Sequence, residues 1–565
     1  MADEGQSREQ TGELVALLQA SVAAARAGDH ATSWRLTSEF GTRFWLADPA
    51  DLPGDLPTTE RTEFHVLRAA AADRMELHDD TVAEVRAWRT LAEDAGDTPS
   101  AVLALSSLCL VAMVVECDDA VLTCGLTPTP ALLTELAARL TDIGAGLTED
   151  SPRHVRVCLS LAAMAGLTCA TSTENAAKRG QFRALCARFT SPTVQPGDRV
   201  LTEAQQLHAD GRTTEAMTLV TDHLATLDPA VSPTQVYEAH DVLGYLSLTV
   251  GETPEDMDTD GVLTHWRACA ELALTLGAPL EGMHRAEQVC QLLNADGDYD
   301  AAYDLASRYG NALDGAPVSP ALLNLRAVRA RAALGADLPY EAFALAASTA
   351  DWSALTPDSE RTLACLSIAT MAAEEAGEAG TLGSSTGETV VSLLERAATL
   401  HLDRGERIPA AQVLRTAARE RCSSGETSRA VELMERALRV LEDPAADTDD
   451  DMLTWHLADW NEDMSAVWEM ADRPDLAVAY AERAARYFRD ARDHSGAALN
   501  WVSAAELYLD QGDGTACDRA LDLAHAELLS VPGGEPDEPG TDVSFDTGEN
   551  AAWEGYHALR NLRQG

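Results

Sequence analysis

The feature that most constrains this chain is a helical segment that recurs every 38–48 residues through its last two thirds. Apolar residues recur three or four positions apart, and no stretch alternates apolar with polar residues as a half-buried strand would. The segments end at Gly211, Gly251, Gly297, Gly335, Gly377, Gly425, Asp472 and Gly512. A helix pair with one apolar face can bury that face only against a neighbouring pair. The sequence therefore predicts a stack of helix pairs.

Three copies carry the pattern most clearly, and they resemble tetratricopeptide repeats. The copy near the C-terminus has Trp501, Ala504, Ala505 and Tyr508 on its first helix, followed by a turn glycine and an alanine-rich second helix. The other two begin at Leu414 and Ala286, and a further copy keeps the Leu-Gly pair of that family at Leu243–Gly244. The resemblance implies an all-α fold, a right-handed α-solenoid of stacked antiparallel helix pairs (a TPR-like superhelix). The spacing exceeds the ~34 residues of the standard repeat, which implies longer helices or inserted loops.

Long repeats of this kind are also similar to the helical sensor and effector domains of large bacterial transcriptional activators. No helix-turn-helix or nucleotide-binding motif accompanies them in this sequence. The resemblance to tetratricopeptide repeats implies a protein or peptide partner bound on the concave face of the solenoid.

The chain is expected to divide into four stretches. Residues 1–190 read as a diverged helical region, and residues 195–530 as the tetratricopeptide-like array. Residues 531–549 are acidic and rich in proline and glycine, which is typical of a flexible loop. Residues 550–565 could form a helix that caps the array.

The charge and the apolar segments exclude several classes of function. The chain has 92 acidic residues against 42 Lys plus Arg, a formal net charge of −50, so we expect neither a nucleic acid nor a membrane surface as a partner. The most apolar stretch, Ala101–Val115, is too short for a membrane span and predicts a buried helix. The start of the chain has no signal-peptide pattern, and the eleven scattered cysteines read mostly as core residues, so a cytoplasmic location is expected.

The motifs that could carry chemistry favour no enzyme and no cofactor. Gly383–Gly387 matches G-x-S-x-G, but a nucleophile elbow needs a preceding strand, and none is predicted there. Asp256, Asp258 and Asp260 match the start of a calcium loop, but Arg267 stands where the bidentate glutamate belongs. We interpret this segment as an acidic turn that caps the helix beginning near Val262.

The candidate partner site is electrostatic. Residues 401–440 contain eight arginines and six acids, a net charge of +2 in a chain of −50. Gln412, Arg415 and Arg419 lie on successive turns of one predicted helix, and neither arginine has an acid three or four positions away. They could bind a carboxylate-bearing peptide, or they could pair with acids of an adjacent repeat.

The corresponding helix face of the Gly297 repeat carries a second polar set, His284, Gln291 and Asn294, beside Glu287. The sequence thus predicts a non-catalytic scaffold or adaptor that binds a protein or peptide, possibly an acidic one. Three alternatives stay open: a regulatory protein that senses a peptide or small ligand, an obligate subunit of a larger assembly, and an enzyme built on a helical toroid.

Overall fold

Within each of two compact units, most helices pack against their neighbours in sequence. The computed structural model describes residues 2–117, 129–146, 153–172, 176–189, 196–250, 258–354, 359–378, 386–442, 450–531 and 547–564. These residues contain 25 α-helices and no strand, as the sequence predicted. The chain divides into two compact units, Met1–Leu338 and Pro339–Gly565, here called unit 1 and unit 2. The predicted boundary near residue 190 falls inside unit 1, and that division stays a prediction.

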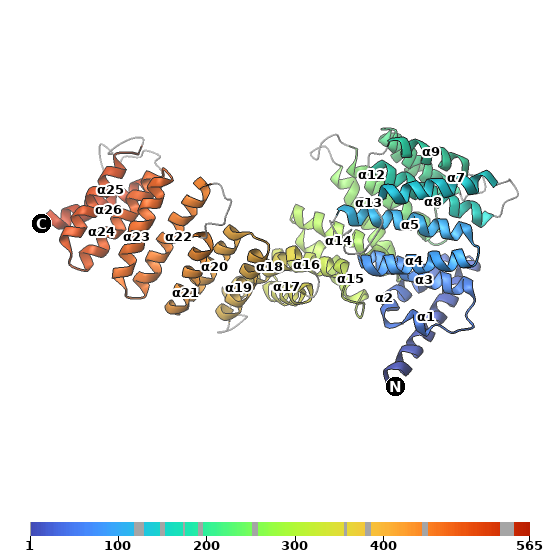
Figure 1. The fold of residues 1–565 in the computed structure, drawn as a ribbon, viewed down its shortest axis with the longest axis horizontal. Coiled ribbons are helices and arrows are strands. Elements are labelled where there is room, and N and C mark those ends of the chain that lie inside the picture. The colour runs from blue at the N-terminus through green and yellow to red at the C-terminus, as the bar shows by residue number, and fades with distance from the viewer. Residues whose placement is uncertain are drawn as a thin grey trace. The chain divides into compact units, whose positions relative to one another are not determined.

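Unit 1 holds fifteen of these α-helices and two short 3-10 helices (Figure 1). They are α1 (Ala2–Arg26), α2 (His30–Arg43), η1 (Phe44–Leu46), η2 (Pro49–Asp51), α3 (Thr58–Arg74), α4 (His78–Asp94), α5 (Thr98–Cys117), α7 (Thr129–Gly146), α8 (Arg153–Ser172), α9 (Ala176–Phe189), α10 (Pro196–Ala209), α11 (Thr213–Leu224), α12 (Pro233–Leu248), α13 (Thr259–Thr275), α14 (Pro279–Asp296), α15 (Tyr299–Ala312) and α16 (Pro320–Gly335).

Unit 2 holds the remaining ten helices, which follow one another as successive pairs (Figure 1). They are α17 (Pro339–Ser353), α18 (Ser359–Glu378), α19 (Thr386–Asp403), α20 (Arg407–Ser423), α21 (Thr427–Glu442), α22 (Asp450–Met470), α23 (Pro474–Asp490), α24 (His494–Asp510), α25 (Gly514–Leu528) and α26 (Thr547–Gln564).

Aspartates begin many of these helices, which ties part of the large negative charge to local structure. Six aspartates each accept a hydrogen bond from the backbone N–H three residues later; they are Asp29, Asp97, Asp258, Asp298, Asp493 and Asp513. A carboxylate at this position satisfies an otherwise unpaired helix N–H and interacts favourably with the helix dipole. Asp258 caps α13, in agreement with the predicted acidic turn.

Most of the predicted helix ends are left-handed turns. Gly211, Gly297, Gly425 and Gly512 have φ between 77° and 84°, a conformation that glycine adopts without strain. The prediction was wrong in detail at Gly335. That glycine is the last residue of α16, where a Cβ atom would lie 2.4 Å from the ring of Tyr299, and the left-handed residue is Asp337. Gly377 lies inside α18, and Gly251 lies outside the described residues.

The apolar stretch 101–115 forms the buried helix that the sequence predicted. It lies within α5, which packs against α4, α7 and α8 around the core of the first half of unit 1. Leu105 and Cys109 are fully buried there, and Phe182 of α9 belongs to the same core. No helix in the described part of the chain is both long and apolar enough to cross a membrane.

Unit 1 also contains a contact that local repetition does not predict, because its first helices pack against its last ones. Helix α14 contacts both α2 and α3, and α12 contacts α2. One core joins Phe40 of α2 and Phe64 of α3 to Leu280 and Met283 of α14. The backbone N–H of Leu280 donates to the Ser38 hydroxyl across 3.2 Å. Helices separated by more than 200 residues therefore share one hydrophobic core.

Unit 2 contains the copy with the clearest tetratricopeptide pattern. Trp501, Ala504 and Ala505 of α24 are buried, and α23 and α25 lie on either side of that helix. Alanines at these positions let neighbouring helices approach closely. The C-terminal helix α26 packs on α24 and α25 through Trp553 and Tyr556. It covers the face of the last repeat that would otherwise be exposed to solvent.

Candidate functional site

The arginine pair predicted on α20 lies against the next helix pair. The guanidinium of Arg415 bonds to Asp459 and Asp463 of α22, with Nη2 and Asp459 Oδ1 separated by 3.0 Å. It also lies over the ring of Trp460, 4.9 Å from the ring centroid. Burial favours the neutral form of Arg415, but the bonds from the two aspartates outweigh this and raise its pKa.

The second arginine of that face makes a looser pair. Arg419 Nη2 lies 2.9 Å from both carboxylate oxygens of Asp463, and its side chain remains 59% exposed. Gln412 is exposed two turns before Arg419 on the same helix. Of the two possibilities drawn from the sequence, the structure shows ion pairs with an adjacent repeat. Partner binding through Gln412, Arg415 and Arg419 stays a prediction, with Gln412 and Arg419 as its accessible members.

The second predicted polar set lies on α14 in unit 1, where its members already bond to one another and to α16. The Gln291 amide donates to Glu287 Oε1 across 2.9 Å. The Asn294 amide is buried and donates to the carbonyl of Val328 across 3.2 Å. His284 is exposed and lies 3.9 Å from the Glu287 carboxylate. Asn294 thus stabilises the α14–α16 contact, and peptide binding by the three predicted residues stays a prediction.

Two motifs from the sequence lie partly outside the described residues. They are Gly383–Gly387, of which the first three residues are not described, and the calcium-loop pattern, of which Asp256 is not described. Asp258 uses its carboxylate to cap α13, and Asp260 lies exposed in the first turn of that helix.

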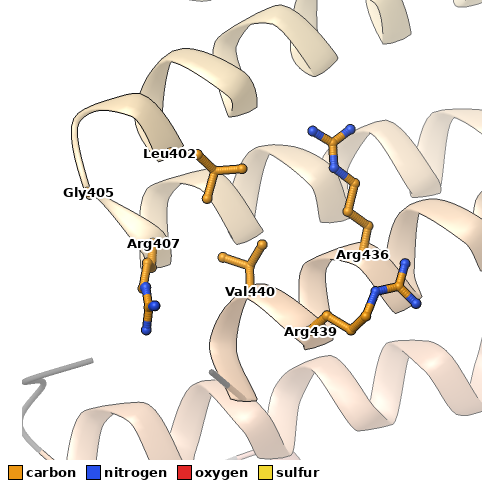
Figure 2. A pocket seen from close by; sticks show the side chains of 6 residues that line it. All are labelled: Leu402, Gly405, Arg407, Arg436, Arg439 and Val440. Carbon is orange, nitrogen blue, oxygen red and sulfur yellow. The ribbon is translucent and has the colours of Figure 1, made fainter. Parts of the chain in front are cut away.

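An open hollow in unit 2 gathers arginines that the sequence analysis did not single out. It has a volume of about 390 Å³ and is lined by Leu402, Gly405, Arg407, Arg436, Arg439 and Val440. Leu402 and Val440 lie between Arg407 on one side and Arg436 and Arg439 on the other (Figure 2). These residues come from the end of α19, the turn before α20, the first residue of α20, and the second half of α21.

The local turn explains why this hollow exists. Gly405 adopts φ 77° and ends the α19 segment, so the chain reverses directly into α20, whose first residue is Arg407. The apolar stripe of α21 faces the core through residues such as Met434 and Leu438. Arg436 and Arg439 lie outside that apolar stripe, on the part of α21 that is next to the turn.

Two arginines of the hollow, Arg436 and Arg439, have few carboxylate partners among the described residues. Arg439 is 67% exposed and has one distant partner, Glu435, 3.6 Å away on its own helix. Arg436 has no ion pair with any residue that the structure describes. A weak pair within one exposed helix contributes little free energy and leaves the cation able to bind another anion. The hollow combines positive charge at its sides with an apolar floor.

The charge balance of the sequence identifies the basic segment that contains the hollow, but it does not identify the three arginines that line it. All three arginines of the hollow lie in residues 401–440, the stretch of net charge +2. Arg415 and Arg419 share one face of a single helix, so local helical spacing identifies them. Arg407, Arg436 and Arg439 come together only through the turn between α19 and α20 and the packing of α20 on α21.

A pair of histidines in unit 1 predicts a pH-dependent stability. His240 of α12 and His265 of α13 have Nδ1 atoms 3.1 Å apart, and burial lowers the pKa of both. The folded unit therefore takes up fewer protons than the unfolded chain as the pH falls below the ordinary histidine pKa of about 6.5. We expect a lower thermal midpoint of unit 1 at about pH 5.5 than at about pH 7.5, measured by circular dichroism.

The matched control is the H240Q variant, which removes one titrating ring from the pair. Its thermal midpoint should depend less on pH than that of the wild type across the same interval. Equal pH dependence in the two proteins would assign the effect to other groups, such as His208, whose pKa burial also lowers.

Comparison with known proteins finds distant structural neighbours and no relative by sequence. No family model matches the chain, and no curated protein matches it. Solved structures do match, and one of them is described as a Podosopora anserina putative kinesin light chain with nearly identical TPR-like repeats. The described residues are all helical and pack as successive helix pairs within each unit, and the structures they are similar to include TPR-like repeat proteins. That neighbour is 16% identical, covers 38% of this chain and 97% of its own, and has a TM-score of 0.27.

Two further structural neighbours have similar TM-scores. BtubC from P. vanneervenii is 14% identical over 47% of this chain and 98% of its own, with a TM-score of 0.29. A Rap protein complexed with competence and sporulation factor is 10% identical over 77% of this chain and 99% of its own, with a TM-score of 0.29. At these scores the likeness concerns the helical repeats alone.

Proposed function

We propose that this protein is a non-catalytic adaptor that binds an acidic peptide segment of a partner protein. The observation that carries the proposal is the hollow lined by Arg407, Arg436 and Arg439 in a chain whose net charge is −50. Sequence analysis expected an acidic partner on the α20 face. On the α20 face, Arg415 is already bonded to two aspartates. The geometry therefore supports the neighbouring hollow as the place where the peptide is anchored.

The size and lining of the hollow suit a short peptide. A volume of about 390 Å³ lies near the lower end of the range for small-ligand sites, roughly 300–1,000 Å³. Arginine forks bind carboxylates with two parallel hydrogen bonds, and Leu402 and Val440 offer an apolar contact between them. A long polyanion such as a nucleic acid would meet the repulsion of the acidic surface beyond the hollow. A segment with one or two carboxylates avoids most of that repulsion.

The test uses a fluorescently labelled Leu-Glu-Glu-Leu peptide, with Leu-Gln-Gln-Leu as the neutral comparison, and follows binding by fluorescence anisotropy. We expect the R436Q/R439Q variant to weaken binding of the acidic peptide by about 100-fold or more, since each of the two lost charge-assisted bonds contributes about 1.5–3 kcal/mol. Added salt should weaken wild-type binding as well.

Arg429 provides a matched control on the same helix. It is 58% exposed, its partner is Glu432 at 3.8 Å, and it does not line the hollow. The R429Q variant removes one positive charge from α21 and should bind the acidic peptide within about twofold of the wild type, because an exposed charge outside the site contributes little. If R429Q loses as much affinity for the acidic peptide as either single hollow variant, R436Q or R439Q, the effect comes from net charge alone. That result would contradict the proposal.

A further inference from the structure

A histidine and two glutamates converge where the turn after α3 meets α14 in unit 1. One ligand atom from each of Glu76, His284 and Glu287 lies within 4.8 Å of the other two. Glu76 lies in the turn after α3, and the other two residues lie one turn apart on α14. Residues more than 200 positions apart in sequence thus present three metal-ligating groups to one point.

The surrounding contacts hold these groups in place. Arg74, at the end of α3, pairs with Glu281 of α14 across 2.5 Å. The Asn324 amide of α16 approaches the Glu76 carboxylate at 3.5 Å. The Gln291 amide donates to Glu287 Oε1 and fixes that carboxylate from the opposite direction along α14. Ligands of bound metals are typically oriented by such outer hydrogen bonds.

The charge balance at this point favours a cation. The side chain of Glu287 is 8% exposed, and its partners among the described residues are the Gln291 amide and His284, with no arginine or lysine among them. A buried carboxylate without a compensating cation is costly, and a second carboxylate close by adds repulsion. A divalent ion would offset both costs.

We propose that Glu76, His284 and Glu287 form a binding site for a divalent first-row transition metal ion. An imidazole with two carboxylates suits Zn²⁺, Mn²⁺, Fe²⁺ or Co²⁺. Calcium and magnesium prefer all-oxygen ligand sets with more donors, so they fit this trio less well. The bound ion would connect the α3–α4 turn to α14 and so stabilise the contact between the two ends of unit 1. The site is separate from the arginine hollow, which belongs to unit 2.

The test is isothermal titration of the full chain with Zn²⁺ in the presence of a large excess of Mg²⁺, which occupies non-specific carboxylates. We expect one zinc per chain and a rise in the thermal midpoint of unit 1. The H284A variant should bind at least about tenfold more weakly. Because His284 is 55% exposed, its removal should leave the fold intact.

Two variants make the result decisive. His494 bonds to a single carboxylate, that of Glu527, with 2.8 Å between Nδ1 and Oε2, so H494A should bind zinc as the wild type does. E287Q should reduce zinc affinity at least as much as H284A, because it removes the buried carboxylate. Wild-type zinc affinity in H284A, or zinc binding that excess Mg²⁺ abolishes, would overturn the proposal.

Discussion

The L280A variant is expected to lose about 2–5 kcal/mol of the free energy of unfolding of unit 1, and none of that of unit 2. Leu280 lies in the first turn of α14 and is 2% exposed. It packs directly on the bare backbone of Gly41 in α2, where a Cβ atom would lie 2.3 Å from Leu280 Cδ2. Truncation would leave a cavity between helices that are far apart in sequence but adjacent in the core.

Hydrogen exchange followed by mass spectrometry can resolve this effect by helix. The amides of α2, α3 and α14 should exchange faster in L280A, while those of α20–α25 keep their wild-type rates. The matched control is L414A, which removes a fully buried leucine from unit 2 and should produce the opposite pattern. A loss below about 1 kcal/mol in L280A would mean that α14 does not dock on α2 in solution.

Sequence periodicity predicts the helices of this protein well, because each helix is specified by neighbouring residues. Trp501, Ala504 and Ala505 were assigned to a buried stripe, and all three are buried in α24. The turn glycines were recognisable since few other residues adopt positive φ without strain. The docking of α14 on α2 could not be predicted in this way, because no local pattern relates residues 38 and 280. A local indication of this contact is Gly41, a residue without a side chain near the end of α2, which lets another helix approach closely.

The candidate site shows the same division between local and distant information. The charge balance of residues 401–440 located the basic segment. The charge balance does not show which arginines are accessible to a partner. The carboxylates that pair with Arg415 lie 44 and 48 residues later in the sequence. That separation is close to the repeat spacing. Comparing each charged residue with those one repeat further along the chain would therefore have found Asp459 and Asp463.

Removing those carboxylates should have the largest effect on unit 2. We expect the D459N/D463N variant to lose about 3 kcal/mol of the free energy of unfolding, because it leaves the Arg415 cation largely buried without a counter-charge. The side chain of Arg415 is 15% exposed, and those of Asp459 and Asp463 are 23% and 20% exposed. Denaturant unfolding, followed by the fluorescence of the tryptophans near α22, measures the loss.

The cause can be isolated by adding R415M to the same background. Methionine fills a similar volume over Trp460 and carries no charge, so the two asparagine substitutions should cost far less in the R415M protein than in the wild type. A coupling free energy of about 2 kcal/mol or more would show that the pairing is formed in solution. If D459N/D463N is as stable as the wild type, Arg415 is not committed to α22. It would then be free to bind an acidic peptide together with Gln412 and Arg419, and the anchor of the partner would return to the α20 face.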